Sequence, residues 1–329
     1  DGAWRVLADR TVTAGGVGYA QENRRLLARV LPEAFRAMQV RPLTPFFDTW
    51  QEALRRLAPC TQQAAGLEPG LTPAIALLTP GTASPLWIAH MSLPRVLSCA
   101  LVGGGDITVP STRGFIKTLR GLQRVDVLLR RIDGRMIDPL ELEAGSLIGV
   151  PGLLDAARAG SVRITNHPGS GAAEAPALAA FLPALCHRLR GEALRLGSVP
   201  TLWLGAPGAL ALVQRQPLHW RMRPALDGGG GQVAAGLPPA GRAELMARVI
   251  ARPWEWAATE AMPASVAPCL ATEGPAAGSL VPRPVVLRLF LVHDGRTWQA
   301  MQGGLARVED GAGPAVSGIS KDVWVLAEE

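Results

Sequence analysis

The spacing of apolar residues along the chain predicts several helices. Two segments repeat apolar side chains at intervals of three and four residues, which places them on one face of a helix. The first comprises Phe46, Phe47, Trp50, Ala53, Leu54 and Leu57, and the second comprises Leu178, Phe181, Leu182, Leu185, Cys186 and Leu189. A third helix should begin before Leu31 and be interrupted at Pro32, because proline lacks the backbone donor that the preceding turn requires.

Other apolar runs are too short for helices and predict strands. The segments at 74–78, 125–129 and 285–292 are of strand length and rich in branched residues, and the segment at 4–8 has the same pattern. Glycine and proline cluster at 66–73, 168–176, 224–240 and 274–284, which indicates long loops. Helices and strands therefore alternate without an internal repeat, and the predicted fold class is α+β, a mixed α/β protein.

The composition indicates a globular protein. The chain has 329 residues, of which 48% are hydrophobic and 18% are charged, and this suffices for a sizeable core in two or three lobes. The net charge of +6 comes from dispersed arginines. Without a basic stripe interleaved with aromatic residues, it argues against nucleic acid as a partner. An arginine surplus suits anionic ligands such as phosphates and carboxylates, but it is equally the usual surface of a GC-rich proteome.

Cysteine usage and hydropathy suggest a protein of a reducing compartment. Cys60, Cys99, Cys186 and Cys269 lie far apart and form no Cys-x-x-Cys pair, so neither a zinc site nor a disulfide framework is indicated. The five histidines are scattered and suggest no histidine-based site. No stretch reaches the roughly 18 consecutive apolar residues of a membrane span. We therefore expect a cytoplasmic protein that is not membrane-bound, and we expect that a segment before Asp1 is missing.

A dense group of polar residues follows the strand predicted at 4–8. The chain reads Asp-Arg-Thr at 9–11, Gly-Gly-Val-Gly-Tyr at 15–19 and Gln-Glu-Asn-Arg at 21–24, which indicates a strand end, a glycine turn and a helix start. Asp9, Glu22 and Asn23 offer the hard oxygen ligands that suit Mg²⁺ and the phosphates it bridges. The alternative is that Asp9 pairs with Arg10 or Arg24 on the surface.

Read together, these motifs resemble the circularly permuted ATP-grasp proteins, the relatives of glutathionylspermidine synthase. Members of that family carry a strand that ends in Asp-Arg-Thr, a Ser-Gly-x-Gly-Tyr turn and a Leu-Glu-Asn-Arg helix start. The resemblance continues in order along the chain, and this order matters more than any single match. The similar blocks lie at 103–109, 125–133, 138–142, 149–154, 166–171, 283–288, 303–308 and 320–324.

The resemblance implies a fold and an activity. The fold would be ATP-grasp in circularly permuted order, with the metal and substrate side and a central α/β region in residues 1–215. Residues 216–329 would form the nucleotide-binding lobes, with the nucleotide cleft between two lobes. The activity would be that of an ATP-dependent carboxylate–amine ligase that works through an acyl-phosphate. Its cofactors would be ATP and Mg²⁺, and its substrate would be a small molecule or peptide that carries a carboxylate and an amine.

Four residues near the end of the strand predicted at 125–129 are candidates for catalysis under this resemblance. Arg130 and Arg131 would grip a carboxylate or an acyl-phosphate, because guanidinium groups pair with both. Asp133 and Glu141 would hold the metal or the amine. The alternative is that the double arginine forms a surface ion pair with these same acids.

The resemblance also implies a set of phosphate-binding residues. Arg223 stands where the family has its nucleotide lysine, and Arg288 and Lys321 would face the phosphates. The glycines after Arg223 would cradle the phosphates through their backbone N–H groups, and the three candidates are Gly228, Gly229 and Gly230. Taken alone, a glycine run is usually only a flexible loop.

The adenine site is implied by one further segment. Residues 254–260 resemble the hinge strand whose backbone binds adenine, and Glu260 would lie near the ribose. Trp254 and Trp256 could contribute an aromatic platform, although tryptophans pack in cores and interfaces more often than they stack on adenine.

Departures from the family pattern favour a second interpretation. Arg223 keeps the charge of the family's lysine but not its compact ammonium geometry. A glutamate of the family is lost at Gly103, and two acids are lost in the segment 83–90, where Ala89 replaces one of them. These losses fit a degenerate ATP-grasp protein that binds a nucleotide or a partner and catalyses nothing.

Overall fold

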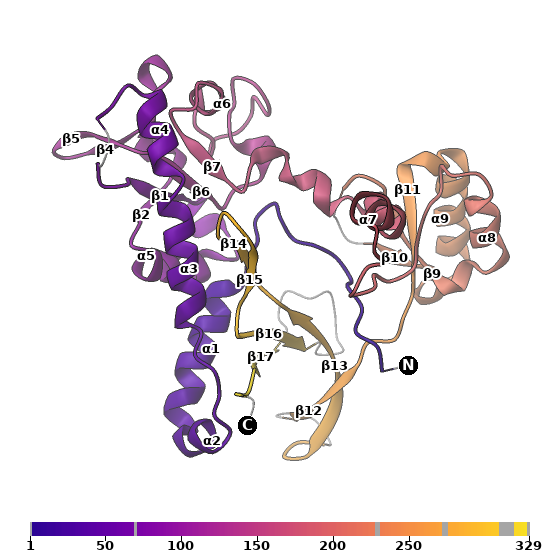
Figure 1. Ribbon diagram of the computed structural model, residues 1–329. Coiled ribbons are helices and arrows are strands. Elements are labelled where there is room, and N and C mark those ends of the chain that lie inside the picture. Colours follow the sequence, from indigo (N-terminus) through magenta and orange to yellow (C-terminus); the bar gives the residue numbers. More distant parts are fainter. Residues whose placement is uncertain (1, 69–70, 228–230, 272–275, 309–318, 328–329) are drawn as a thin grey trace. The chain divides into compact units, whose positions relative to one another are not determined.

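The computed structural model describes residues 2–68, 71–227, 231–271, 276–308 and 319–327, and the chain groups into two compact units (Figure 1). Unit 1 comprises residues 1–12 and 169–263, and unit 2 comprises residues 13–168 and 264–329. The sequence-based boundary at 215 falls inside unit 1. The reason is that the strand at 201–203 pairs with the strand at 256–260, so both sides of residue 215 belong to one sheet.

Unit 2 begins with four helices. They are α1 (Val17–Val30), α2 (Pro32–Ala37), α3 (Thr44–Arg55) and α4 (Ala58–Ala64). The interruption predicted at Pro32 is confirmed, since α1 ends at Val30 and Pro32 opens α2. The stripe predicted on the second helical segment is also confirmed, because α3 buries Phe46, Phe47 and Leu54.

A parallel sheet forms the centre of unit 2. Its strands are β1 (Ile75–Leu78), β2 (Ala100–Val102), β6 (Val127–Arg130) and β7 (Arg163–Thr165), in the order β2-β1-β6-β7. Helix α5 (Trp87–Leu97) connects β1 to β2, and α6 (Leu153–Arg158) precedes β7. Every residue of β1 and β6 is buried, as expected for parallel strands covered on both faces.

Alternate residues of these strands enter two different cores. Leu77 and Leu129 pack with residues of α1, α3 and α5, whereas Leu78 and Leu128 pack with residues around α6. This alternation follows from the two-residue period of a strand. The strands predicted at 74–78 and 125–129 are therefore confirmed, and their continuous apolar character reflects burial on both faces.

The other sheets of unit 2 are antiparallel. The strands β3 (Ile107–Thr108), β4 (Phe115–Thr118) and β5 (Gly121–Arg124) form one of them. A second has the order β12-β13-β16-β17, with bounds Val266–Leu270, Leu280–Arg288, Gly303–Val308 and Ile319–Trp324. A hairpin joins β14 (Leu291–His293) to β15 (Trp298–Ala300). The strand predicted at 285–292 is thus two strands, because β13 ends at Arg288.

Unit 1 is built around an antiparallel sheet of order β10-β9-β11-β8. The strands are β8 (Thr201–Trp203), β9 (Trp220–Pro224), β10 (Gln232–Val233) and β11 (Trp256–Glu260), and the helices are α7 (Leu182–Arg190), α8 (Ala209–Arg215) and α9 (Pro239–Ala251). Met222 and Ala258 pack against α8 and α9 on one face of this sheet. The strand predicted at 4–8 is reduced to one bridge, between Val6 and Ser198.

The helix predicted around 178–189 is only partly confirmed. A 3₁₀ turn (Pro176–Ala180) precedes α7, and the exposed fractions of Phe181, Leu185 and Leu189 are 43%, 37% and 77%. The apolar stripe therefore exists, but the described residues do not cover it. In the described part of the chain, the longest helix is α1 with 14 residues, and no helix combines the length and hydrophobicity that a bilayer span requires.

Gly18, in the first turn of α1, lets two helices of unit 2 approach closely. A Cβ atom on Gly18 would lie 2.5 Å from Oγ of Ser92 and 2.8 Å from the carbonyl oxygen of Ala89, both in α5. Such distances are too short for any side chain. The glycine at position 18 is therefore required by the packing of α1 against α5.

Candidate functional site

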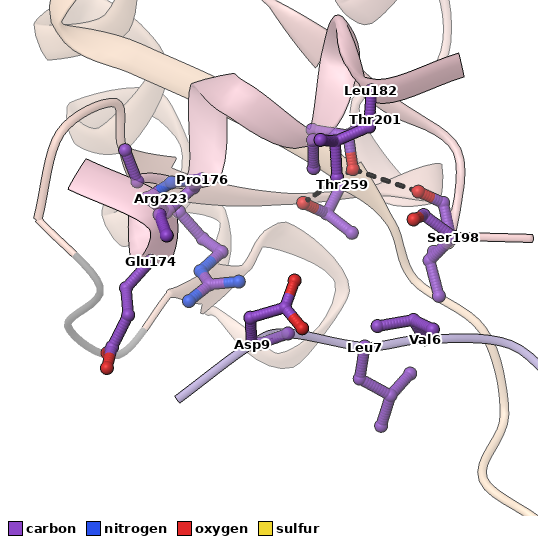
Figure 2. A pocket seen from close by; sticks show the side chains of 15 residues that line it. Val6, Leu7, Asp9, Glu174, Pro176, Leu182, Ser198, Thr201, Arg223 and Thr259 are labelled. Carbon is purple, nitrogen blue, oxygen red and sulfur yellow. Dashed lines mark hydrogen bonds between the residues drawn. The ribbon is translucent and has the colours of Figure 1, made fainter. Parts of the chain in front are cut away.

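Asp9 and Arg223, two residues predicted to bind ligands, line one pocket of unit 1 (Figure 2). Thr201 of β8 and Thr259 of β11 line it as well. Figure 2 shows the Asp9 carboxylate and the Arg223 guanidinium turned toward the same space, while the Glu174 carboxylate points away. The cavity measures about 30 Å³, which is room for about two water molecules. It offers charge for a ligand but does not by itself enclose a nucleotide.

Arg223 belongs to a cluster of three arginines. Burial lowers the pKa of Arg223, and the nearby charges of Arg10 and Arg221 lower it further. Arg221 and Arg223 alternate along β9 with Met222, which is buried in the core, so both arginines lie on the opposite face of the sheet. Cations held together repel one another, and an anion relieves this repulsion. The cluster therefore suits an oxyanion such as a polyphosphate.

Glu174 holds the N-terminal segment within unit 1. Its carboxylate accepts hydrogen bonds from the backbone N–H groups of Thr11, at 2.5 Å, and Val12, at 2.6 Å, and it pairs with Arg10 at 3.2 Å. Arg10 therefore pairs with Glu174 and not with Asp9, contrary to the surface pairing considered from the sequence. No spacing rule could have connected Glu174 with residues 10–12, because the contact spans more than 160 positions.

Glu260, predicted to lie near the ribose, ends β11. Its carboxylate lies 3.1 Å from Nε2 of His219, and its N–H donates to the carbonyl of Pro200. The preceding residue, Thr259, lines the pocket of Asp9 and Arg223. The hinge segment thus ends beside that pocket, and its role in binding adenine stays a prediction.

The two tryptophans of this segment have different environments. Trp256 packs against the core of α8 and α9, whereas Trp254 is 57% exposed. Both line a second hollow of about 330 Å³ together with Leu226. Core packing therefore accounts for Trp256 but not for Trp254.

Arg288 and Lys321 lie in the antiparallel sheet of unit 2 that contains β13 and β17. Nη1 of Arg288 donates to the carbonyl of Gly15 at 2.8 Å, and Nζ of Lys321 donates to the carbonyl of Pro268 at 2.6 Å. Their contact with phosphates stays a prediction, as does one cleft shared with Arg223 and Glu260. The predicted glycines Gly228, Gly229 and Gly230 lie outside the described residues.

Arg130 and Arg131 are neighbours in sequence but have separate surroundings. The guanidinium of Arg130 is buried and donates to the backbone carbonyls of Ile132, at 2.5 Å, and Asn166, at 3.1 Å. Arg131 is 5% exposed and donates through Nη1 to the carbonyls of Thr13 and Ala14 at 3.0 and 3.3 Å. Neither forms the surface ion pair considered as the alternative, since the acids predicted to pair with them bind other arginines.

Asp133 and Glu141 each have an arginine partner close to them. The Asp133 carboxylate accepts from the N–H of Arg135 at 2.8 Å, and Glu141 pairs with Arg158 of α6. Burial alone would raise the pKa of Asp133, but the hydrogen bonds and charge of Arg135 outweigh it and the net shift is downward. The hydrogen bonds from Arg158 likewise lower the pKa of Glu141. Both groups are therefore anionic at neutral pH, and their binding of metal or amine stays a prediction.

The remaining metal candidates, Glu22 and Asn23, are engaged with side chains of unit 2. Glu22 pairs with Arg25 at 2.7 Å, one turn along α1, and the amide of Asn23 donates to Oγ of Ser320 at 3.0 Å. Among the described residues, no three His, Cys, Asp or Glu side chains gather in a way that could hold a metal ion. As arranged, these residues do not fit a preformed Mg²⁺ site.

Two acids of the motifs that resemble the family have structural roles that the sequence did not reveal. The buried carboxylate of Asp138 accepts from the N–H groups of Gly152 and Leu154, at 3.2 and 3.0 Å, and thereby caps the start of α6. The carboxylate of Asp322 pairs with Arg24 at 2.6 Å, so Arg24 is also not a partner of Asp9. The motifs at 138–142 and 320–324 thus stabilise unit 2 rather than supply a ligand site through these acids.

Comparison with known proteins identifies the class of protein. Residues 1–309 match the family of circularly permuted ATP-grasp type 2 proteins. The chain belongs to this family, and its fold is an ATP-grasp fold in circularly permuted order, as the motifs predicted. The chain is also similar to the crystal structure of D-alanyl-alanine synthetase A from Vibrio cholerae. The matched region covers 77% of this chain and 74% of that one, with 10% sequence identity and a TM-score of 0.36.

Bacterial relatives resemble the chain over nearly its whole length. An uncharacterized protein of Mycobacterium bovis is 34% identical over 99% of this chain and 58% of its own length. Another, from Mycobacterium tuberculosis, is 34% identical over 100% of this chain and 36% of its own length. An uncharacterized Synechocystis protein is 30% identical over 99% of this chain and 66% of its own. The chain thus spans from about a third to about two thirds of the length of these relatives.

Proposed function

We propose that this chain is the ATP-grasp part of a ligase that uses ATP to join a carboxylate to an amine through an acyl-phosphate. The observation that carries the proposal is the cluster of Arg10, Arg221 and Arg223 beside the Asp9 pocket, in a chain of the ATP-grasp family. Such a reaction depends on positioning and on neutralising phosphate charge, and fixed cations do both.

The positive charge of the arginines in unit 1 complements the negative charge of nucleotide phosphates. Arg223 would pair with a phosphate oxygen, and Arg221 would raise the local potential that attracts it. Bound ATP would supply the phosphoryl group that activates the carboxylate. The substrate is a small molecule or a peptide with a carboxylate and an amine, and Arg288 and Lys321 are the phosphate-binding candidates of unit 2.

Magnesium is the part of the family's chemistry that the described residues do not fit. Glu22 and Asn23 would have to release Arg25 and Ser320 before they could bind a cation. We therefore route no step through a metal bound by these side chains. Asp9 is a metal candidate that lines the pocket described in unit 1.

A second candidate function is a degenerate ATP-grasp protein that binds a nucleotide or a partner without catalysis. The engagement of Glu22 and Asn23 with neighbouring side chains supports it. The presence of Arg223 where the family has a lysine also supports the degenerate protein. An arginine binds phosphate but does not reproduce the point charge of an ammonium group.

Calorimetry and ADP formation separate the two candidates. ATP is titrated into the chain with and without Mg²⁺, and ADP release is then measured with mixed amino acids and short peptides. A ligase of this type binds ATP and forms ADP continuously only when amine and carboxylate are both present, because the acyl-phosphate must be consumed by the amine before the next turnover. Binding without ADP release favours the degenerate protein, and no binding in either condition rejects the ligase and leaves only a degenerate protein that binds a partner.

A matched pair of variants tests the role of the arginine cluster. Arg223→Ala removes a charge-assisted hydrogen bond worth about 1.5–3 kcal/mol, so the dissociation constant of ATP should rise by about 10-fold or more. Arg215→Ala removes an exposed arginine from α8 of the same unit and should leave the constant unchanged. Equal effects of the two variants would show that only net charge matters.

A further inference from the structure

The carboxyl ends of β1 and β6 form the topological switch point of the parallel sheet in unit 2. The chain adds β2 on one side of β1, and later adds β6 and β7 on the other side. In sheets of this kind, ligands bind outside the carboxyl ends of the strands where the order reverses. The residues that follow β1 and β6 at this point are Thr79 and Arg131, and both are buried.

Arg131 uses only one of its three guanidinium nitrogens on the described residues. Nη1 donates to the carbonyls of Thr13 and Ala14, and the guanidinium lies over the ring of Trp50, with 5.5 Å from Cζ to the ring centroid. Nε and Nη2 are buried and have no hydrogen-bond partner within the described residues. These two nitrogens form the side edge of the guanidinium, whose parallel N–H groups match the two oxygens of a carboxylate.

His90 of α5 adds a third unpartnered nitrogen near Arg131. Thr79 Oγ1 accepts from the N–H of Gly81 at 3.1 Å and lies 2.9 Å from Nδ1 of His90. In the tautomer in which the Thr79 hydroxyl donates to Nδ1, the ring hydrogen resides on Nε2. Nε2 is buried and has no partner within the described residues. In that tautomer His90 presents an N–H donor to a ligand.

Among the described residues, the groups around Arg131 and His90 add positive charge and include no carboxylate that acts on Arg131. Besides burial, the groups that act on the pKa of Arg131 are Arg130 and Cys99. Burial raises the pKa of the Cys99 thiol to about 11, and burial followed by the charge of Arg131 lowers the pKa of His90 to about 4. Both groups are neutral at pH 7. A buried guanidinium without a paired anion is costly, and a negatively charged ligand offsets this cost.

We propose that Arg131 and His90 form a binding site for the carboxylate group of a ligand at the carboxyl ends of β1 and β6. The side edge of Arg131 receives both carboxylate oxygens, and Nε2 of His90 donates to one of them. A carboxylate suits the site because its two oxygens match the two parallel N–H groups on the side edge of Arg131. The assignment of this carboxylate to a ligase substrate rests on the proposed function, whereas the binding itself does not.

Nuclear magnetic resonance of arginine side chains tests the proposal directly. The chain is labelled with ¹⁵N-arginine, and the Nε–H signal of Arg131 is assigned by its loss in Arg131→Lys. Sodium acetate, sodium phosphate and sodium chloride are titrated at matched ionic strength. With acetate, the Arg131 signal should shift, or give way to a new signal, until the effect saturates. With chloride it should not change in this way. A response to phosphate alone overturns the choice of carboxylate, and no response to any anion overturns the site.

Three variants separate a binding role from a structural one. His90→Phe removes the Nε2 donor and should weaken acetate binding by about 2- to 10-fold, whereas His90→Gln keeps a donor near the same place and should restore most of it. Cys99→Ala changes another neighbour of Arg131 that donates nothing in this scheme, so acetate binding should stay the same. If His90→Phe binds acetate as well as the unaltered chain, His90 has no part in the site.

The test also distinguishes this site from the proposed ligase activity, because it contains no nucleotide. Acetate binding at Arg131 without ADP formation in any substrate mixture would leave the site standing and reject the ligase. ADP formation with a folded chain whose Arg131 signal ignores acetate would leave the ligase standing and reject the site.

Discussion

The buried pair of Arg24 and Asp322 gives the sharpest prediction for the stability of unit 2. Asp322→Ala removes a carboxylate that lies 2.6 Å from Nε of Arg24 and accepts from Nε1 of Trp324 at 2.8 Å. Arg24 is 8% exposed, so the variant leaves a buried guanidinium without its anion. Breaking one partner of such a pair costs about 3–5 kcal/mol.

Two features of the structure adjust this magnitude. Oδ1 of Asp322 is buried without a partner within the described residues, so the native pair already contains an unsatisfied acceptor. Arg24 retains its hydrogen bonds to the carbonyls of Arg41, at 2.5 Å, and Val323, at 2.8 Å, in the variant. Both features reduce the loss, and we expect a value near the lower limit, about 3 kcal/mol.

Urea denaturation followed by circular dichroism measures the loss as a shift of the midpoint at unchanged slope. Glu52→Ala is the matched control, because it breaks an exposed helical pair with Arg56, at 3.2 Å, and should cost less than about 0.5 kcal/mol. In the double variant Arg24→Met/Asp322→Ala, the two losses should be less than additive, since no buried charge remains. A loss below about 1 kcal/mol for Asp322→Ala would refute the reasoning.

Three further predictions concern unit 2 and its helices. Gly18→Ala should lower the free energy of unfolding by about 1–3 kcal/mol, because the added Cβ would meet α5. In Gly105→Ala the added Cβ meets nothing within 4 Å, so this variant should have little effect. Equal melting temperatures of the two variants in thermal unfolding would contradict the close packing at Gly18. Asp138→Ala should cost about 1–2 kcal/mol by the loss of a helix cap, and Asp138→Asn, which keeps one acceptor, should cost less in the same assay. The depressed pKa of His90, about 4 against 6.5, means that the unfolded chain binds the proton first as the pH falls. Stability should therefore be fully present above about pH 6.5 and fall toward pH 4 by up to about 1.4 kcal/mol per pH unit, and His90→Gln should remove this part of the slope in urea titrations.

Local pattern predicted most elements of the fold, because each depends on residues close together in sequence. The stripe of α3 and the break at Pro32 follow from the helical period and from the chemistry of proline. The local pattern does not predict which part of the protein covers an apolar stripe. The α7 residues Leu185 and Leu189 have helical spacing, yet the described residues leave them 37% and 77% exposed.

The candidate site was predicted in part, and the reason for the rest is also physical. The motif containing Arg130 and Arg131 indicated a pair acting together, but successive residues point to opposite sides of an extended backbone. Arg130 consequently binds backbone carbonyls near β7, and Arg131 those of residues 13 and 14. The contacts of Glu174 and Asp322 join residues more than 160 positions apart, which no local pattern reveals without the folded chain.

The pairing of Arg24 with Asp322 also has a consequence for synthesis on the ribosome. The two residues are 298 positions apart, and translation at about 5–20 residues per second separates their appearance by about 15–60 s. During this interval α1 has emerged, but the strand that neutralises its buried guanidinium has not been made. Nascent chains should therefore keep α1 accessible to chaperones and proteases until β17 leaves the exit tunnel, so the last strand of unit 2 sets the time at which its first helix becomes protected.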